Sequence, residues 1–204
     1  MPISKGESWG EPGPLPPHGV VVRSDGEARA IVTAARRAGE PIPPLGLLGG
    51  DLCRTLGGTG EEARLRSDEA VLLPVDLGAV LVDGRLHWFV AHLVARRGWW
   101  RGRVVAAMNA QFLGAWDVAP RGHPNDGRLD VLDADLPFDE RLQVRARLKH
   151  GTHVPHPRID ERHQAAVQLD FPGPVPVYLD GERLDDPAKS LSIRVEPDAL
   201  LCVV

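Results

Sequence analysis

The most constraining feature of this sequence is the regular alternation of short apolar runs and turn signals that begins near Glu69. Turn-forming pairs such as Asp83-Gly84 and Asp180-Gly181 recur between these runs, and Asp-Gly favours the tight turns of β-hairpins. Many short strands at this spacing are typical of an antiparallel sandwich or barrel. The expected strands are residues 70–73, 79–82, 86–90, 104–109, 117–119, 129–132, 165–169, 175–179 and 191–195.

One stretch in this region, residues 138–149, predicts a helix instead. Leu142, Ala146 and Lys149 recur at helical spacing, so they are expected to share one face of it. Arg141 and Arg145 are expected to lie in solvent.

The beginning of the chain has a different character. Residues 1–18 hold five prolines and three glycines, and they are expected to form an extended or disordered tail. Residues 19–22 form a strand candidate. Residues 27–38 carry the apolar periodicity of an amphipathic helix, and Gly39 is well placed to end it.

A second strand and helix follow, at residues 44–48 and 52–56, with Asp51 as the expected N-cap of the helix. The whole pattern predicts an α+β fold, because strand–helix pairs are followed by a run of strands. We expect a truncated α/β subdomain of nucleotide-binding type at 19–68. An antiparallel β-sandwich-like domain is expected at 69–204, with a last strand able to return to the first part.

Composition and charge narrow the class of protein. A net charge of −4 argues against a general nucleic-acid binder, and the sequence has no apolar run long enough to predict a membrane-spanning helix. The first residues lack the apolar core of a signal peptide. Cys53 and Cys202 are expected to be reduced structural thiols. A cytoplasmic protein is therefore expected, with peripheral contact with a membrane left open.

A strand, a tight turn and a helix follow one another in V-V-V-R-S-D-G-E-A-R-A-I-V, residues 20–32. This layout cradles phosphate in many proteins, because a glycine-rich turn and a helix N-terminus present backbone N–H groups to the anion. Here Arg23 and Ser24 stand where glycines would be expected, and Glu27 adds negative charge at the helix start. A nucleotide loop, its remnant and an ordinary turn all remain open.

Three segments carry a family resemblance: A-P-R-G-H-P-N-D-G-R-L-D-V-L at 119–132, L-K-H-G-T-H at 148–153 and V-Y-L-D-G-E at 177–182. In this order they resemble segments of the diacylglycerol kinase, sphingosine kinase and bacterial lipid kinase family, which shares a superfamily with the NAD kinases. Residues 89–98 and 108–116 fall where that family has the early strands of its second domain. The resemblance implies an α/β nucleotide domain, a β-rich domain and an active site in the cleft between them.

The resemblance also implies where ATP and Mg²⁺ would bind. The family's G-G-D-G-T phosphate loop corresponds to residues 23–27, which lack two of its glycines and its threonine. Its second nucleotide loop corresponds to a shortened stretch around residue 50. We therefore expect the use of ATP to be weak or lost. The residues implied to bind the cofactor are Asp25, Gly26, Gly49, Gly50 and Asp51.

Glu182 is the implied catalytic residue. In the family, the glutamate of the D-G-E segment is the proposed general base that accepts the proton of the lipid hydroxyl, a role that suits a carboxylate at the edge of a cleft. The alternative is a plain hairpin tip after Asp180-Gly181 with the glutamate in solvent.

Asp126 is the implied metal ligand. In bacterial members, the aspartate of the 119–132 segment binds a structural Mg²⁺ with two backbone carbonyls, which here belong to His123 and Arg128. Hard oxygen ligands on a tight turn suit this ion. The alternative is an Asn-Asp-Gly turn that needs no ion.

Two further clusters each have a functional and a plain interpretation. The histidines at 150, 153, 156 and 163 have spacings that could suit zinc, but Pro155 and Pro157 break any helix that would align them. The basic and aromatic segment at 96–103 suits a membrane interface or a lipid headgroup. It equally suits a loop whose tryptophans pack on the sandwich.

Three functions remain open from the sequence. The first is a lipid kinase-family protein with ATP-dependent phosphorylation of a lipid hydroxyl as its ancestral activity. The second is a non-catalytic protein that keeps the lipid-side domain and binds a lipid, a membrane surface or a partner, as a homo-oligomer or with a kinase-like chain. The third is a structural β-domain without a small ligand. A filled cleft around Asp25 would favour the last two.

Overall fold

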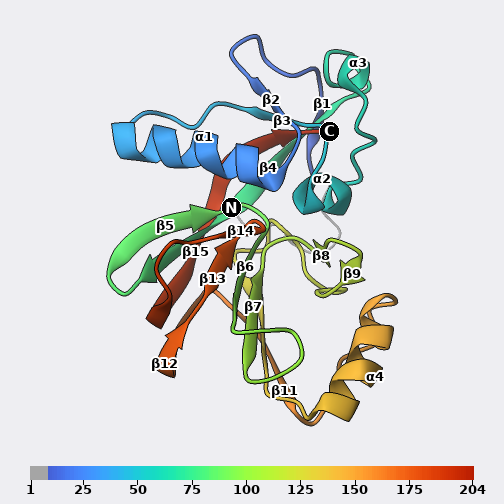
Figure 1. Ribbon diagram of the computed structural model, residues 1–204. Coiled ribbons are helices and arrows are strands. Elements are labelled where there is room, and N and C mark those ends of the chain that lie inside the picture. Colours follow the sequence, from blue (N-terminus) through green and yellow to red (C-terminus); the bar gives the residue numbers. More distant parts are fainter. Residues whose placement is uncertain (1–8) are drawn as a thin grey trace.

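The computed structural model describes residues 9–204 and confirms the expected α+β fold. Helices and a short parallel pair of strands from the first part of the chain adjoin larger, mainly antiparallel sheets (Figure 1). Residues 1–8, the first part of the expected tail, lie outside the described residues. None of the helices in the described part is long and apolar enough to cross a membrane.

Residues 9–18 pack against the protein instead of extending from it. Strand β1 (Glu11–Pro12) pairs with β4 (Val71–Val82). Leu15 is only 5% exposed and belongs to a small apolar cluster with Leu65 and Val203. Of the two predicted alternatives, disorder is therefore wrong for this stretch and extended backbone is compatible with it, because Leu15 gives the stretch apolar surface to bury.

The α/β part is built around helix α1 (Asp25–Ala38). Its buried apolar residues recur at helical spacing from Ala28 onward, as predicted. Ser24 caps its start by accepting the backbone N–H of Glu27, and Gly39 ends it with a φ of 69°, a conformation that glycine adopts without strain. The other elements of this part are β2 (Val20–Val22), β3 (Leu45–Leu47), α2 (Asp51–Thr55) and α3 (Glu62–Leu65).

Two sheets and one small hairpin hold the strands. The seven-stranded sheet has the order β1-β4-β15-β3-β2, with β5 paired to β4 and β12 paired to β15. The six-stranded sheet has the order β11-β10-β7-β6-β13-β14, and β8 pairs with β9 alone. The remaining strands are β5 (Arg85–Phe89), β6 (His92–Arg96), β7 (Val104–Met108), β8 (Phe112–Leu113), β9 (Trp116–Asp117), β10 (Leu129–Ala134), β11 (Ile159–Gln164), β12 (Ala166–Val175), β13 (Val177–Leu179), β14 (Glu182–Arg183) and β15 (Ala188–Val203).

Two long strands belong to both parts of the molecule. β4 and β15 pair antiparallel from Val82 to Leu72, so the runs predicted as separate strands at 70–73 and 79–82 form one strand. β15 also pairs with β12 and, through Cys202 and Val203, runs parallel to β3. One continuous sheet therefore carries the α/β part and one face of the sandwich.

Three main apolar clusters follow from this arrangement. The largest fills the space between the two sheets, with Phe89 and Leu191 among its fully buried members. A second lies between the seven-stranded sheet and helices α1 and α2. The third covers the outer face of the six-stranded sheet, where helix α4 (Phe138–Leu148) packs. In Figure 1, α4 (orange) lies at the end of the molecule away from α1 (blue).

Helix α4 buries a different face from the predicted one. Arg141 and Val144 are buried, whereas Leu142 is 48% exposed and Ala146 and Lys149 are exposed. Burial of the arginine is possible because its guanidinium donates to main-chain carbonyl oxygens, while its stem covers apolar surface.

Candidate functional site

An open hollow of about 500 Å³ lies where the N-termini of α1 and α2 face the six-stranded sheet. Turns at the ends of β2, β3 and β13 supply its polar residues, because the chain leaves each of these strands at the same side of the molecule. Four carboxylates line this acidic hollow: Asp25, Asp51, Asp180 and Glu182.

In the loop that corresponds to a phosphate loop, side chains of the same loop accept the backbone N–H groups. The backbone N–H of Arg23 donates to Glu27 Oε2 at 2.7 Å, and the N–H of Glu27 donates to Ser24 Oγ at 3.2 Å. In a phosphate cradle such N–H groups point at the anion. Here the Glu27 carboxylate accepts one of these N–H groups, and loss of phosphate binding stays a prediction.

Asp25 accepts hydrogen bonds from the free backbone N–H groups at the start of helix α2, from across the hollow. Its carboxylate accepts the backbone N–H groups of Asp51 at 2.6 Å and of Leu52 at 3.1 Å. Burial raises the pKa of Asp25, although these two hydrogen bonds oppose the shift. The cap residue of α2 is Gly50, with a φ of 97°, and a Cβ there would lie 2.5 Å from Asp25 Oδ1. Only glycine therefore fits this close approach.

Asp51 is not the N-cap that the sequence predicts. It is the first residue of α2, and its carboxylate points away from its own helix to accept the backbone N–H of Gly114. Its Oδ2 also lies 3.0 Å from His92 Nε2. Burial opposes ionisation, but the hydrogen bonds from His92 and Gly114 lower the pKa of Asp51 overall. The His92 ring is itself buried, and Asp51 and Asp180 raise its pKa against that burial.

Asp180 anchors the turn that presents Glu182. Its buried carboxylate accepts the backbone N–H groups of Val90, Ala91 and His92 at 2.8–3.0 Å. Burial raises its pKa to about 6. Asp180 has a φ of 51° and Gly181 follows with 83°, as in the predicted Asp-Gly hairpin turn.

Glu182 lies at the start of β14, against helix α1. Its carboxylate contacts the guanidinium of Arg29, which also lies 3.8 Å from Asp180. A Cβ on Gly26 would lie 2.8 Å from Glu182 Oε1, so glycine permits this approach. The side chain is 65% exposed. Both sequence interpretations are therefore compatible with its position: a hairpin tip in solvent and a carboxylate on a hollow.

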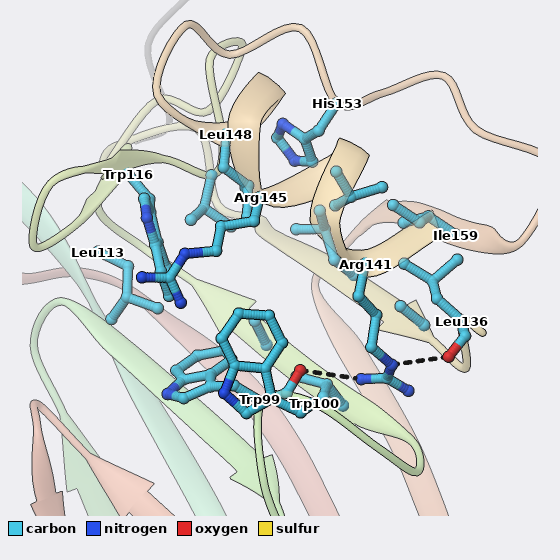
Figure 2. Close-up of a pocket in the computed structure, with 16 residues that line it drawn as sticks. Trp99, Trp100, Leu113, Trp116, Leu136, Arg141, Arg145, Leu148, His153 and Ile159 are labelled. Carbon is cyan, nitrogen blue, oxygen red and sulfur yellow. Dashed lines mark hydrogen bonds between the residues drawn. The ribbon is translucent and has the colours of Figure 1, made fainter. Parts of the chain in front are cut away.

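A second, apolar pocket of about 110 Å³ lies on the outer face of the six-stranded sheet. Strands β7 and β10 form its floor, helix α4 forms one wall, and the tryptophans of the 96–103 segment form another (Figure 2). Arg141 joins these walls, because its guanidinium donates to the carbonyl oxygens of Leu136, Trp99 and Gly102 at 2.6, 3.2 and 2.5 Å.

Indole rings and arginines gather around this apolar pocket. Arg145 extends from α4 with its guanidinium 5.0 Å from the Trp100 ring and 5.5 Å from the Trp116 ring, and Figure 2 shows it beside Trp116. Trp99 packs edge-on against Trp116, whereas Trp100 is 44% exposed. The tryptophans of the 96–103 segment therefore line a pocket and do not simply cover the sandwich.

Leu113 lines both the acidic hollow and the apolar pocket. The hairpin β8–β9 that carries it lies next to α2, where Asp51 holds the N–H of Gly114. The two spaces are therefore neighbours with one shared wall.

Of the residues implied to bind a cofactor, four line the acidic hollow: Asp25, Gly26, Gly50 and Asp51. Gly49 lies behind the first loop, where a Cβ would be 2.6 Å from the Arg23 carbonyl oxygen. His92 and Asp180 also belong to this site, although they were not singled out from the sequence. The only available signal was the place of Asp180 within the V-Y-L-D-G-E segment.

The residues implied to bind a structural ion lie elsewhere. Asp126 Oδ1 accepts the N–H of Arg128 at 3.0 Å, and its Oδ2 lies 3.1 Å from His163 Nε2. His123 accepts the N–H of Asn125 through its ring. This arrangement suits a self-contained turn, and binding of Mg²⁺ there remains a prediction.

The comparisons with known proteins agree with this architecture. The family described as the YegS C-terminal NAD kinase beta sandwich-like domain matches residues 78–204. No curated protein sequence matches the chain.

Solved structures share its fold at low sequence identity. A diacylglycerol kinase from Bacillus anthracis aligns with a TM-score of 0.61 and 16% identity, over 91% of this chain and 75% of that one. Another structure from the same organism gives a TM-score of 0.71 and 15% identity over 91% and 77%. Yeast NADH kinase, solved with NADH, gives 0.52 and 11% over 92% and 61%.

Proposed function

Because this chain belongs to the family of the YegS C-terminal NAD kinase beta sandwich-like domain, we propose that it is a lipid kinase-like protein that binds a hydroxyl-bearing lipid. The apolar chain of the lipid occupies the apolar pocket, and its hydroxyl headgroup lies in the acidic hollow. The observation that carries this proposal is the position of Leu113 in the walls of both spaces.

The apolar pocket suits the hydrocarbon part of such a ligand. Its volume of about 110 Å³ is of the same order as the ~150 Å³ cavity that admits benzene in an engineered protein. Each buried methylene would contribute about 0.8 kcal/mol. Trp100, which is 44% exposed, would cover the part of the chain that leaves the pocket.

The acidic hollow suits a hydroxyl headgroup. Asp51 and Glu182 present carboxylate oxygens that can accept a hydrogen bond from a hydroxyl, and both line this hollow next to Leu113. In the ancestral reaction Glu182 would accept the proton of that hydroxyl, and an exposed carboxylate beside Arg29 is available for this role.

ATP and Mg²⁺ would supply the transferred phosphoryl group when bound, but the first loop does not fit a triphosphate as it stands. Its N–H groups already donate to Glu27 and Ser24, and Asp25 takes those at the start of α2. We therefore propose that the chain alone binds the lipid without efficient use of ATP. Phosphoryl transfer would then depend on a kinase-like partner chain or on a second copy of this chain.

The test uses a short-chain monoacylglycerol below its micelle-forming concentration and the purified full chain. Binding is followed by the fluorescence of the tryptophans around the pocket and by calorimetry. Ala106→Phe places a ring in the floor of the pocket, where Ala106 is 8% exposed, and should weaken binding at least about tenfold. Ala146→Phe on the exposed face of α4 is the matched control and should change it less than about twofold.

Unchanged affinity in a folded Ala106→Phe variant would refute the lipid-binding proposal. Val144→Phe, from the opposite wall of the pocket, serves if the first variant does not fold. Saturable binding of ATP·Mg²⁺ to the unmodified chain at micromolar concentration would refute the proposed loss of nucleotide binding. The purified chain should show no such signal up to millimolar ATP.

A further inference from the structure

The ionisable side chains that line the apolar pocket are all basic. They are Arg141, Arg145 and His153, whereas four carboxylates line the neighbouring acidic hollow. An anionic group is therefore favoured on the pocket side of Leu113 and repelled on the other side. We propose that the apolar pocket binds an amphipathic monocarboxylate of the medium-chain fatty acid class. Its chain lies against the indole rings, and its carboxylate is bound by Arg145 and His153.

Arg145 has no anionic partner in the described part of the chain. Its guanidinium contacts the rings of Trp100 and Trp116, and it forms no hydrogen bond or ion pair with residues 9–204. An arginine stacked on aromatic rings keeps the edge of its guanidinium free, and that edge matches the two oxygens of a carboxylate. The side chain is exposed, so it can turn toward a carboxylate in the pocket.

Arg141 adds positive charge without a free donor edge. Its guanidinium donates to the carbonyl oxygens of Leu136, Trp99 and Gly102. These oxygens carry no net charge, so the buried guanidinium still attracts an anion. The carboxylate of Asp135 lies 3.5 Å from it but is 71% exposed, so water screens much of that negative charge.

His153 gives an independent indication of a polar ligand group. It lines the pocket and is only 1% exposed. Neither ring nitrogen has a hydrogen-bond partner of normal geometry within residues 9–204, although the backbone of Val118 lies near the ring. A buried polar group without a partner is costly, and a ligand oxygen that accepts an N–H of the ring would remove that cost. Figure 2 shows His153 near Leu148 and Arg145 near Trp116, along the α4 side of the pocket.

Two carboxylates act on His153 from outside the pocket. Burial lowers the pKa of His153, while Glu161 and Asp117 oppose the shift. Asp117 accepts a hydrogen bond from Gln111 at 3.1 Å, and Glu161 lies 3.8 Å from the guanidinium of Arg121. Neither of these carboxylates lines the pocket. A ligand carboxylate therefore meets a neutral ring that can donate one N–H.

The rest of the lining suits a hydrocarbon chain. Ala106 and Leu132 lie on the floor, and the tryptophans form the walls. A chain that fills about 110 Å³ supplies affinity that a carboxylate alone lacks. This inference shares the apolar pocket with the proposed function, but it needs neither a hydroxyl group nor the acidic hollow. The two can therefore fail separately.

The experiment compares octanoate with 1-octanol, which has the same chain length and no charge. Both are titrated into the purified chain by calorimetry at neutral pH, below the concentrations at which they aggregate. Octanoate should bind at least about fivefold more tightly, because its carboxylate gains hydrogen bonds to charged and polar donors. From butanoate to octanoate, each methylene that enters the pocket should raise the affinity up to about fourfold.

Three variants locate the carboxylate. Arg145→Met keeps most of the apolar stem, so it should lower the affinity for octanoate at least about fivefold and that for 1-octanol less than about twofold. His153→Phe keeps an aromatic ring and should lower the affinity for octanoate about threefold. Arg147→Met is the matched control, because it removes the same charge from the exposed face of the same helix. It should change either affinity less than about twofold.

Equal affinities of the unmodified chain for octanoate and 1-octanol would overturn the inference. Equal losses in Arg145→Met and Arg147→Met would do the same, since they would indicate a general effect of charge. Arg145 is exposed, so its variant should fold and the decision does not depend on His153→Phe. Binding of monoacylglycerol without a preference for octanoate would refute only this inference. Binding of octanoate without binding of monoacylglycerol would refute only the proposed function.

Discussion

The two spaces that share Leu113 are built in opposite ways. The acidic hollow is formed by turns at strand ends, and many of its polar groups are hydrogen-bonded to each other. Glu27 accepts a backbone N–H of the first loop, and Asp25 accepts a backbone N–H at the start of α2. The apolar pocket is formed by a helix, a loop and a sheet face, and it stays open at about 110 Å³. One space therefore offers mainly apolar surface to a ligand, whereas the other offers carboxylates beside backbone N–H groups that already have partners.

Removing Arg141, which links the walls of the apolar pocket, should reduce the stability of the protein more than any other change proposed below. Arg141→Ala deletes a guanidinium that donates to three carbonyl oxygens, one in the loop before α4 and two in the loop between β6 and β7. Three unpaired acceptors and the lost stem should destabilise the protein by about 4 kcal/mol. Chemical denaturation measures this value. Arg147→Ala, on the exposed face of the same helix, should cost less than about 0.5 kcal/mol, and equal losses would contradict the role of Arg141.

The stability of the protein should depend on pH because of Asp180 in the acidic hollow. Burial raises the pKa of Asp180 from 3.8 to about 6, so the native state holds this proton more tightly than the unfolded chain. The stability that it contributes is complete below pH 3.8 and is lost as pH rises through about 6. A shift of about two units corresponds to about 3 kcal/mol.

Denaturation of the unmodified chain and of Asp180→Asn at about pH 4 and about pH 7 measures this effect. The unmodified chain should lose about 2 kcal/mol relative to the variant over that range, because the aspartate of the unfolded chain is already partly ionised at about pH 4. A difference that does not change with pH would show that Asp180 is ionised in the native state throughout.

The smallest expected effect concerns the first loop, where the Glu27 carboxylate accepts the backbone N–H of Arg23. Glu27→Ala frees the N–H of Arg23 and removes a negative charge at the start of α1. Stability should fall by about 1 kcal/mol, and affinity for pyrophosphate should rise a few-fold by calorimetry. Glu40→Ala, at the other end of the helix, should change neither. A higher affinity for pyrophosphate in both variants would indicate a general effect of removing negative charge.

Local patterns predicted most of the fold. Turn pairs located the hairpins, apolar spacing located α1, and three motifs identified the family. The strand β11 escaped prediction because its sequence I-D-E-R-H-Q is mostly polar and Ile159 is its one fully buried residue. The buried face of α4 was misplaced for the opposite reason, because Arg141 is a charged residue that finds its partners in loops.

The candidate site was predicted only in part, because its key contacts join distant segments. Asp25 reaches Asp51 across 26 positions, and Asp51 reaches His92 across 41. Asp51 was assigned as the cap of its own helix from local preference alone. Its real partner, Gly114, lies in a hairpin whose position depends on the whole β-rich part.

The long strand β15 also has a consequence for how the protein is made. β3 and β4 emerge from the ribosome early, but the strand that pairs with both of them comes last. At about 5–20 residues per second, the stretch between β4 and β15 takes roughly 5–20 s to synthesise. During that time the apolar edges of β3 and β4 remain unpaired, which exposes the nascent chain to aggregation. Yield in cells should therefore depend on chaperone supply and translation rate more than on the stability of the finished protein.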